Sequence, residues 1–196
     1  MLLLYYYNMV ASSILPVTFH KGSIYFLFGK ENEMEDSAKG FSDFGGGVEK
    51  GENILQTAYR EGAEELSGFL GDEVALKSLI KKNGGFYKVH HKEHNYHVHM
   101  FFLEYDNKMP EYFTRHHKFV WNRMNKNILN ESKLFEKQEI KWFSEKDLRT
   151  HRSEFRTFYQ DIVDKIASEI PNIRKFIMKR GNKKRTLKRG IVIGGK

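Results

Sequence analysis

Six residues in one helix-length segment combine a glycine, four glutamates and an arginine at fixed spacing. The segment GGGVEKGENILQTAYREGAEELSG, from Gly45 to Gly68, holds seven charged side chains, of which five are glutamates. On a helix, Glu61, Glu64 and Glu65 take positions i, i+3 and i+4 of one face. Such close like charges repel one another, and a hard divalent cation with oxygen ligands relieves the repulsion. The alternative is an ordinary solvated helix face.

This spacing resembles the signature of the Nudix hydrolases. The chain reads Gly46, five residues, Glu52, seven residues, Arg60-Glu61, two residues and Glu64-Glu65. The Nudix signature is Gly, five residues, Glu, seven residues, Arg-Glu, an aliphatic residue, any residue, Glu-Glu, any residue and Gly. All six of these positions match. The resemblance implies an α/β fold, the Nudix-type α/β/α sandwich with a central mixed β-sheet.

Two positions depart from the signature. Gly62 stands at the aliphatic position, where glycine costs about 1 kcal/mol relative to alanine inside a helix. Ser67 stands at the final glycine position, and Gly68 follows one residue later, where it can still cap the helix. Neither departure removes a carboxylate, so they affect the packing and the end of the helix rather than its chemistry.

The resemblance implies a hydrolase that acts on a pyrophosphate bond and uses Mg²⁺ or Mn²⁺ to cleave a nucleoside diphosphate linked to another moiety. The implied metal ligands are the carboxylates of Glu61, Glu64 and Glu65 and the carbonyl of Gly45. Glu52 and Arg60 are implied to orient this set rather than to react. Gly46 and Gly47 are implied to contact the substrate.

A general base is a separate question, because members of the family use either a glutamate of the motif or one from a later loop. Glu139, just before the segment IKWF, stands where many members place that loop glutamate. Glu136 is the second candidate. Either residue could equally be an ordinary surface acid.

The segment TRHHKFVWNRMNK, residues 114–126, mixes basic and aromatic side chains. Such mixing suits stacking on a base and pairing with phosphate, so Arg115, Lys118, Phe119 and Trp121 are candidate substrate-binding residues. The alternative is an inserted helix that buries Phe119, Val120 and Trp121.

Five histidines lie close together in the sequence, at positions 90, 91, 94, 97 and 99. A structural zinc site is one interpretation. The other is that one or two of them line a nucleotide pocket. The second is favoured because the carboxylates already supply a site for a hard metal, and because His97 and His99 share one face of a predicted strand.

Charge divides the 196-residue chain into two parts. Residues 174–196 hold ten Lys and Arg and no acid, which leaves the first 173 residues with 23 basic and 25 acidic side chains out of the totals of 33 and 25. We therefore predict a hydrolase domain over residues 1–173 and a flexible basic tail over 174–196 that contacts RNA. The predicted RNA-binding residues are Lys179, Arg180, Lys183, Lys184, Arg185, Lys188 and Arg189.

Hydrophobic periodicity gives the elements that position these groups. Segments SSILPVTF and SIYFLFG predict a β-hairpin, and FSDFGGG predicts a short strand before a helix over residues 52–66. Further strands are predicted at GGFYKVHH, NYHVHMFFLEY and EIKWF. An amphipathic helix is predicted from Ser153 and is interrupted at Pro171. The apolar start, MLLLYYYNM, predicts a strand or a flap rather than a membrane span or signal peptide.

Two classes of substrate are consistent with the motif. A basic tail suits release of a methylated cap nucleotide from the 5′ end of RNA, and FSDFGGG before the motif resembles Nudix proteins of large DNA viruses, some of which remove caps. The alternative is a small molecule: a modified nucleoside triphosphate, a nucleotide sugar or a dinucleoside polyphosphate. A catalytically dead nucleotide-binding module is disfavoured by the intact glutamates. With no cysteine and no predicted membrane span, we expect a cytoplasmic protein, in the host cytoplasm if it is viral.

Overall fold

The computed structural model describes residues 10–33, 39–132 and 135–180, with no account of side chains at 130–132. Its strands are β1 (Ala11–His20), β2 (Ser23–Glu31), β3 (Phe41–Ser42), β4 (Phe44–Gly47), β5 (Phe86–His91), β6 (Tyr96–Phe102) and β7 (Lys137–Ser144). Its helices are α2 (Ile54–Glu65), α3 (Glu73–Lys82), α4 (Met109–Trp121), α5 (Lys126–Ser132), α6 (Asp147–Thr150) and α7 (Gln160–Ser168). The segment MLLLYYYNM lies outside the described residues.

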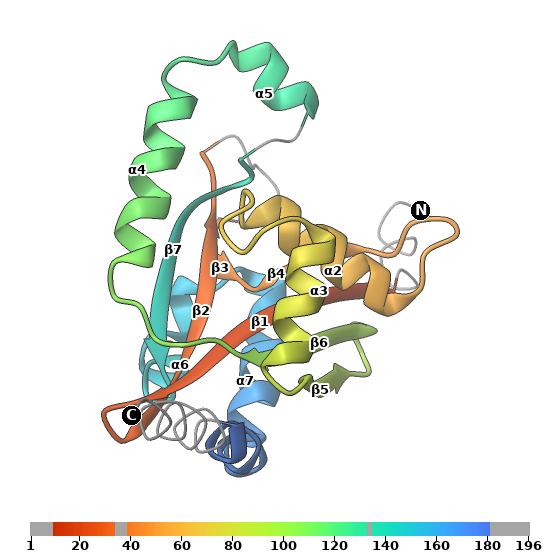
Figure 1. The fold of residues 1–196 in the computed structure, drawn as a ribbon, viewed down its shortest axis with the longest axis vertical. Helices are drawn as coiled ribbons and strands as arrows, with labels where there is room; N and C mark the ends of the chain where they lie inside the picture. The colour runs from red at the N-terminus through yellow and green to blue at the C-terminus, as the bar shows by residue number, and fades with distance from the viewer. Residues whose placement is uncertain (1–9, 34–38, 133–134, 181–196) are drawn as a thin grey trace, which may run out of the picture.

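The strands form one mixed sheet. In the described part of the chain it has seven strands, in the order β3-β2-β1-β6-β5, with β4 also paired to β1 and β7 to β2. Strands β1 and β6 run parallel, and the other pairs are antiparallel. Figure 1 shows α2 and α3 on one face of this sheet, here named the front face, and α7 on the other, the back face. The predicted α/β/α sandwich with a central mixed sheet is confirmed.

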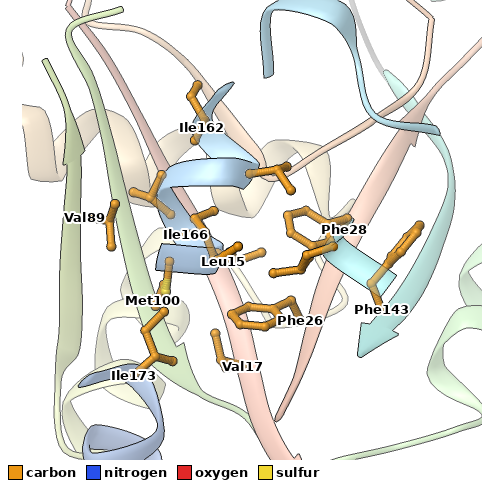
Figure 2. Packing of buried hydrophobic residues seen from close by; sticks show 14 of the residues in the cluster. Leu15, Val17, Phe26, Phe28, Val89, Met100, Phe143, Ile162, Ile166 and Ile173 are labelled. Atoms are coloured by element: carbon orange, nitrogen blue, oxygen red, sulfur yellow. The ribbon is translucent and has the colours of Figure 1, made fainter. Parts of the chain in front are cut away.

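The back face carries the larger apolar cluster. Buried aromatic and aliphatic side chains of β1, β2, β6 and β7 meet Ile162 and Ile166 of α7 (Figure 2). A smaller cluster fills the front face between the sheet, α2 and α3, and includes Ile14, Phe44 and Ala58. The front cluster is the one that supports the glutamate-bearing helix.

The helical region after Ser153 differs from the prediction. Phe155 is extended and forms a bridge with Phe41, so the chain makes only short 3₁₀ turns before α7 begins at Gln160. The interruption falls at Glu169, and Pro171 lies in the first turn of a further helical stretch over residues 170–180.

The end of the predicted hydrolase domain falls inside that last helical stretch. Ile177 is fully buried in the back cluster, and Arg180 donates a hydrogen bond to the Gly84 carbonyl at 3.0 Å. Residues 174–180 therefore pack on the domain, and the other predicted RNA-binding residues, 183–189, lie outside the described residues.

Candidate active site

The sequence of helix α2 determines where the helix begins and which side of it is buried. Asn53 caps the helix by accepting hydrogen bonds from the backbone N–H groups of Leu55 and Gln56, and the Gln56 side chain accepts one from Asn53 N. Ala58 and Gly62 are buried against the sheet. The helix thus starts two residues after the predicted position and turns Ala58 and Gly62 to the core.

Two glycines, Gly62 of α2 and Gly46 of β4, let the helix lie close to the sheet. A Cβ added to Gly62 would lie 2.4 Å from Ile14 Cδ1, so the Ile14 side chain fills the space of the aliphatic residue that the signature has here. A Cβ on Gly46 would lie 2.3 Å from Glu61 Oε1. The glycine at position 46 therefore makes room for a carboxylate of α2.

Arg60 holds three of the motif glutamates together. Its guanidinium donates to both carboxylate oxygens of Glu52, at 2.8 and 3.1 Å, and to Glu61 Oε1 at 2.8 Å and Glu64 Oε2 at 3.3 Å. These bonds from Arg60, with another from Thr57, lower the pKa of Glu52 to about 2. The geometry suits the positioning role expected for Glu52 and Arg60.

Glu61 and Glu64 differ in exposure. The Glu61 side chain is 14% exposed and that of Glu64 is 62% exposed. Burial raises the pKa of Glu61, and Arg60 opposes the rise. Glu64 thus lies on the exposed side of α2, whereas Glu61 lies between the helix and Gly46 and is only partly open to solvent.

Glu65 lies one helical turn after Glu61, on the same side of α2, and is buried more deeply. It is buried, accepts a hydrogen bond from Gly45 N at 2.7 Å, and lies 3.2 Å from Lys137 Nζ. Burial raises its pKa, Lys137 opposes the rise, and nearby carboxylates, Glu136 among them, add to it. The structure therefore does not bring the three predicted metal ligands together.

Lys137 is the centre of a buried ionic network that sequence reasoning missed. Its ammonium contacts Glu31, Glu65 and Ser42, and Arg156 donates to Glu31 from the back side. Burial alone would lower the pKa of Lys137, but Glu65 and Glu31 outweigh it and raise that pKa. A bulge at Lys30/Glu31 displaces Lys137 from the regular alternation of β7.

The carboxylates of α2 differ in whether they can hold a divalent cation. Within the described ranges, no three His, Asp or Glu side chains lie close enough to hold a metal ion. Glu64 nevertheless offers an exposed carboxylate and Glu61 a partly exposed one, and carboxylate oxygens are the donors that Mg²⁺ and Mn²⁺ prefer. These two fit such a cation, whereas Glu65 is engaged by Lys137 and by Gly45 N.

The two candidates for the general base lie differently. Side chains alternate along β7, where Ile140 packs in the front cluster and Phe143 in the back cluster. Glu139 therefore shares the back face with Phe143, away from α2. Glu136 precedes β7 and is near enough to Glu65 to affect its pKa. The geometry disfavours Glu139 as the base and favours Glu136.

The mixed basic and aromatic segment forms α4 and the turn after it, beside β7 (Figure 1). Trp121 is 7% exposed, and both the His117 ring and Lys126 Nζ cover its ring. Phe119 is instead 58% exposed. The alternative of a burying helix is thus right for Trp121 and wrong for Phe119.

Those contacts leave Trp121 no open stacking surface. Arg115 is exposed and paired with Glu111, and Lys118 is exposed as well. Substrate binding by Arg115, Lys118 and Phe119 stays a prediction.

The five histidines do not form one cluster. His90 and His97 stack on each other with ring centroids 4.0 Å apart, and His91 stacks on His94. His99 is buried and donates from Nδ1 to the Ser13 carbonyl, with a pKa lowered to about 4 by burial. This division gives no support to a zinc site.

A mixed sheet between helices, with a carboxylate-bearing helix organised by an arginine, defines an α/β/α sandwich with a carboxylate-rich site on one face. The chain belongs to the NUDIX domain family, whose model matches residues 9–165. The predicted family and the predicted class of pyrophosphate-bond hydrolase are thereby confirmed. Among the described residues, no helix is both long and apolar enough to span a bilayer.

Solved structures with similar folds share little sequence with this chain. An Ap4A hydrolase from C. elegans, in a binary complex, is 14% identical with a TM-score of 0.46, over 84% of this chain and 98% of that one. A mutT/nudix family protein from Listeria innocua is 15% identical with a TM-score of 0.45, over 86% and 98%. No functionally curated protein matches the chain.

Proposed function

We propose that this protein uses Mg²⁺ or Mn²⁺ to hydrolyse a nucleoside diphosphate linked to another moiety, and that its substrate is the 5′ cap of RNA. The observation that carries the reaction is the Arg60 guanidinium, which binds Glu52, Glu61 and Glu64 at one end of α2. It fixes Glu61 beside Gly46 and Glu64 on the exposed side of α2.

The chain's own residues have separate tasks in this reaction. Glu61 and Glu64 would hold the cation, which supplies charge neutralisation at the pyrophosphate and polarises its bridge. Arg60 keeps Glu61 in the space that Gly46 leaves. Glu136 accepts the proton of the attacking water at a carboxylate oxygen, and the glycines of β4 leave room for the phosphates to approach the backbone.

The choice of RNA rests on charge. Residues 174–196 hold ten cations and no acid, whereas the rest of the chain is close to neutral. A polyanion longer than one nucleotide is the ligand that such a segment suits. A small nucleotide would gain little from it.

The metal-facing role is tested with Glu61→Gln and Glu64→Gln, with Glu93→Gln in an exposed turn as the matched control. Each of the first two variants should lose on the order of a hundredfold in turnover, because each removes a charged ligand from the cation. Mn²⁺ binding, followed by electron paramagnetic resonance, should weaken in parallel. Control-like turnover in both variants, at saturating metal, would reject the assignment.

The RNA substrate is tested by deleting residues 181–196, a cut that keeps Ile177 and Arg180 in place. The deletion removes six cations, Lys183, Lys184, Arg185, Lys188, Arg189 and Lys196. If all six contact phosphates, the slope of log K against log salt for a long capped RNA should fall by about 4. Hydrolysis of a cap dinucleotide should be unchanged. Equal slopes before and after deletion would favour a small-molecule substrate.

A further inference from the structure

One row of residues crosses four strands on the front face. Ser12 of β1 is directly opposite Gly46 on one side and His97 on the other, and His97 is opposite His90 of β5. Residues opposite one another in neighbouring strands point to the same face of a sheet. The Cβ direction of Gly46 meets Glu61 of α2, so this whole row faces the α2 side.

The row places two imidazoles beside the candidate active site. Neighbouring strands lie about 4.8 Å apart, so the Cα of His97 is about 10 Å from that of Gly46 and the Cα of His90 about 15 Å. Ser12 between them is fully buried, so the row reaches the surface at His97 and His90 rather than at Ser12. The residues from Gly46 to His90 therefore share one face of four neighbouring strands with the carboxylate of Glu61.

The two rings form a face-to-face aromatic stack. Their centroids are 4.0 Å apart and their planes differ by 6°. His97 is half-buried and His90 is exposed, so the stack is open at one side. Burial, the neighbouring His90 and Lys88 lower the pKa of His97, which favours an uncharged ring at neutral pH.

The next histidine along β5 points to the other face. His91 stacks on His94, and His94 Nε2 lies 3.5 Å from Asp161 Oδ2 of α7 on the back face. His90 and His91 are thus neighbours in β5, but only His90 belongs to the row that faces α2.

We propose that the His97–His90 stack binds the nucleobase of the substrate on its open outer face, while the phosphates lie at Glu61 and Glu64. This inference rests on the proposed function and assigns one end of that substrate a place in the fold. Every base has a planar π-face that stacks on an aromatic ring, and the imidazole nitrogens can hydrogen-bond to a base edge. The strand register separates the two ends of the site by a distance that a nucleoside phosphate can span.

Steady-state kinetics of His97→Ala and His90→Ala test the stacking, with His91→Ala as the matched control. Loss of one stacking ring should raise KM about tenfold with kcat nearly unchanged. His97→Phe should restore much of the lost affinity because it keeps a planar ring. Hydrolysis of a ribose pyrophosphate without a base should be the same in all variants. His90→Ala, at an exposed position, keeps the test valid if His97→Ala unfolds.

A second measurement separates this inference from the proposed function. Guanosine diphosphate, added without metal, should shift the imidazole Cε1–H resonances of His90 and His97 in NMR spectra and leave those of His91 unchanged. Such shifts in a protein that hydrolyses no nucleotide would keep the subsite and reject the reaction. Normal hydrolysis with unchanged KM in both alanine variants and no shifts would overturn the subsite and keep the reaction.

Discussion

The two faces of the sheet are built by opposite means. On the back face, large rings fill space: Phe28 packs against Phe143, Phe155 and Tyr159 at centroid distances of 5.7, 4.9 and 6.2 Å. On the front face, glycines remove side chains, so that helix α2 and its carboxylates come close to the strands. Bulk stabilises one face, and the absence of bulk positions chemistry on the other.

Charge follows the same division. On the front face, Glu65 of α2 and Lys137 of β7 form a buried ion pair. The desolvation cost of such a pair often exceeds its Coulombic gain. The back face stabilises mainly by apolar burial. Substitutions on the back face should therefore change stability and leave chemistry intact, whereas those on the front face should affect both.

The largest effect is expected from Phe28→Ala on the back face. Phe28 is fully buried, and removal of its ring should lower the free energy of unfolding by about 3–5 kcal/mol. Phe119→Ala, at a 58% exposed position, is the control and should change it by no more than about 0.5 kcal/mol. Chemical denaturation measures both. Turnover per folded molecule should stay at the wild-type level in Phe28→Ala.

A smaller effect is expected when the front-face gap is filled. Gly62→Val places the aliphatic residue of the signature against Ile14 Cδ1 and should destabilise the fold by about 1–3 kcal/mol. The double variant Gly62→Val/Ile14→Ala should be more stable than the sum of the two single effects predicts, because the valine refills the space that isoleucine leaves. Strict additivity in a double-mutant cycle would show that the two side chains do not compete for this space.

The same contrast separates what the sequence could predict from what it could not. The position of α2, to within two residues, and the proximity of Arg60 to Glu61 and Glu64 follow from local spacing and capping, so the motif predicts them. The deep burial of Glu65 depends on Lys137, which comes from a strand more than seventy residues later. A lysine at the start of a strand is normally read as exposed, and no local signal marks this one as buried.

The questions that the sequence left open share that long-range origin. The face occupied by Glu139 is set by the register of β7 on β2. Which ring of the 114–126 segment is buried depends on contacts from His117 and Lys126 rather than on the pattern of basic and aromatic residues. Likewise, Gly62 can be seen as a departure in the sequence, but its compensation by Ile14 needs the packed structure.

The free energy of unfolding should depend on pH through His99, a buried residue of β6. His99 is buried and uncharged in the folded state, with a pKa of about 4 against 6.5 when unfolded. The unfolded chain takes up this proton first, so stability is lost as the pH falls from about 6.5 towards 4. His99→Gln should remove about 2 kcal/mol of the loss between pH 8 and pH 5.

The control for this effect is a titration of opposite sign. Burial raises the pKa of Asp43 to about 6, so its ionisation lowers stability as the pH rises. Asp43→Asn should therefore change the pH dependence in the direction opposite to that of His99→Gln. Parallel urea titrations at several pH values measure both slopes. An unchanged slope in His99→Gln would mean that the imidazole is hydrated in the folded protein.

The smallest effect is expected at the end of α2. Ser67 replaces the final glycine of the signature yet keeps a left-handed backbone, with φ of 50°, before Gly68 at φ of 72°. A non-glycine residue pays a steric penalty in this region, and glycine does not. Ser67→Gly should therefore stabilise the protein by up to about 1 kcal/mol, reduced by the greater freedom of glycine in the unfolded chain. Gly68→Ala, which adds a second strained residue, should destabilise it. Thermal unfolding of the two variants should shift in opposite directions, and a lower midpoint for Ser67→Gly would show that the serine conformation is not strained.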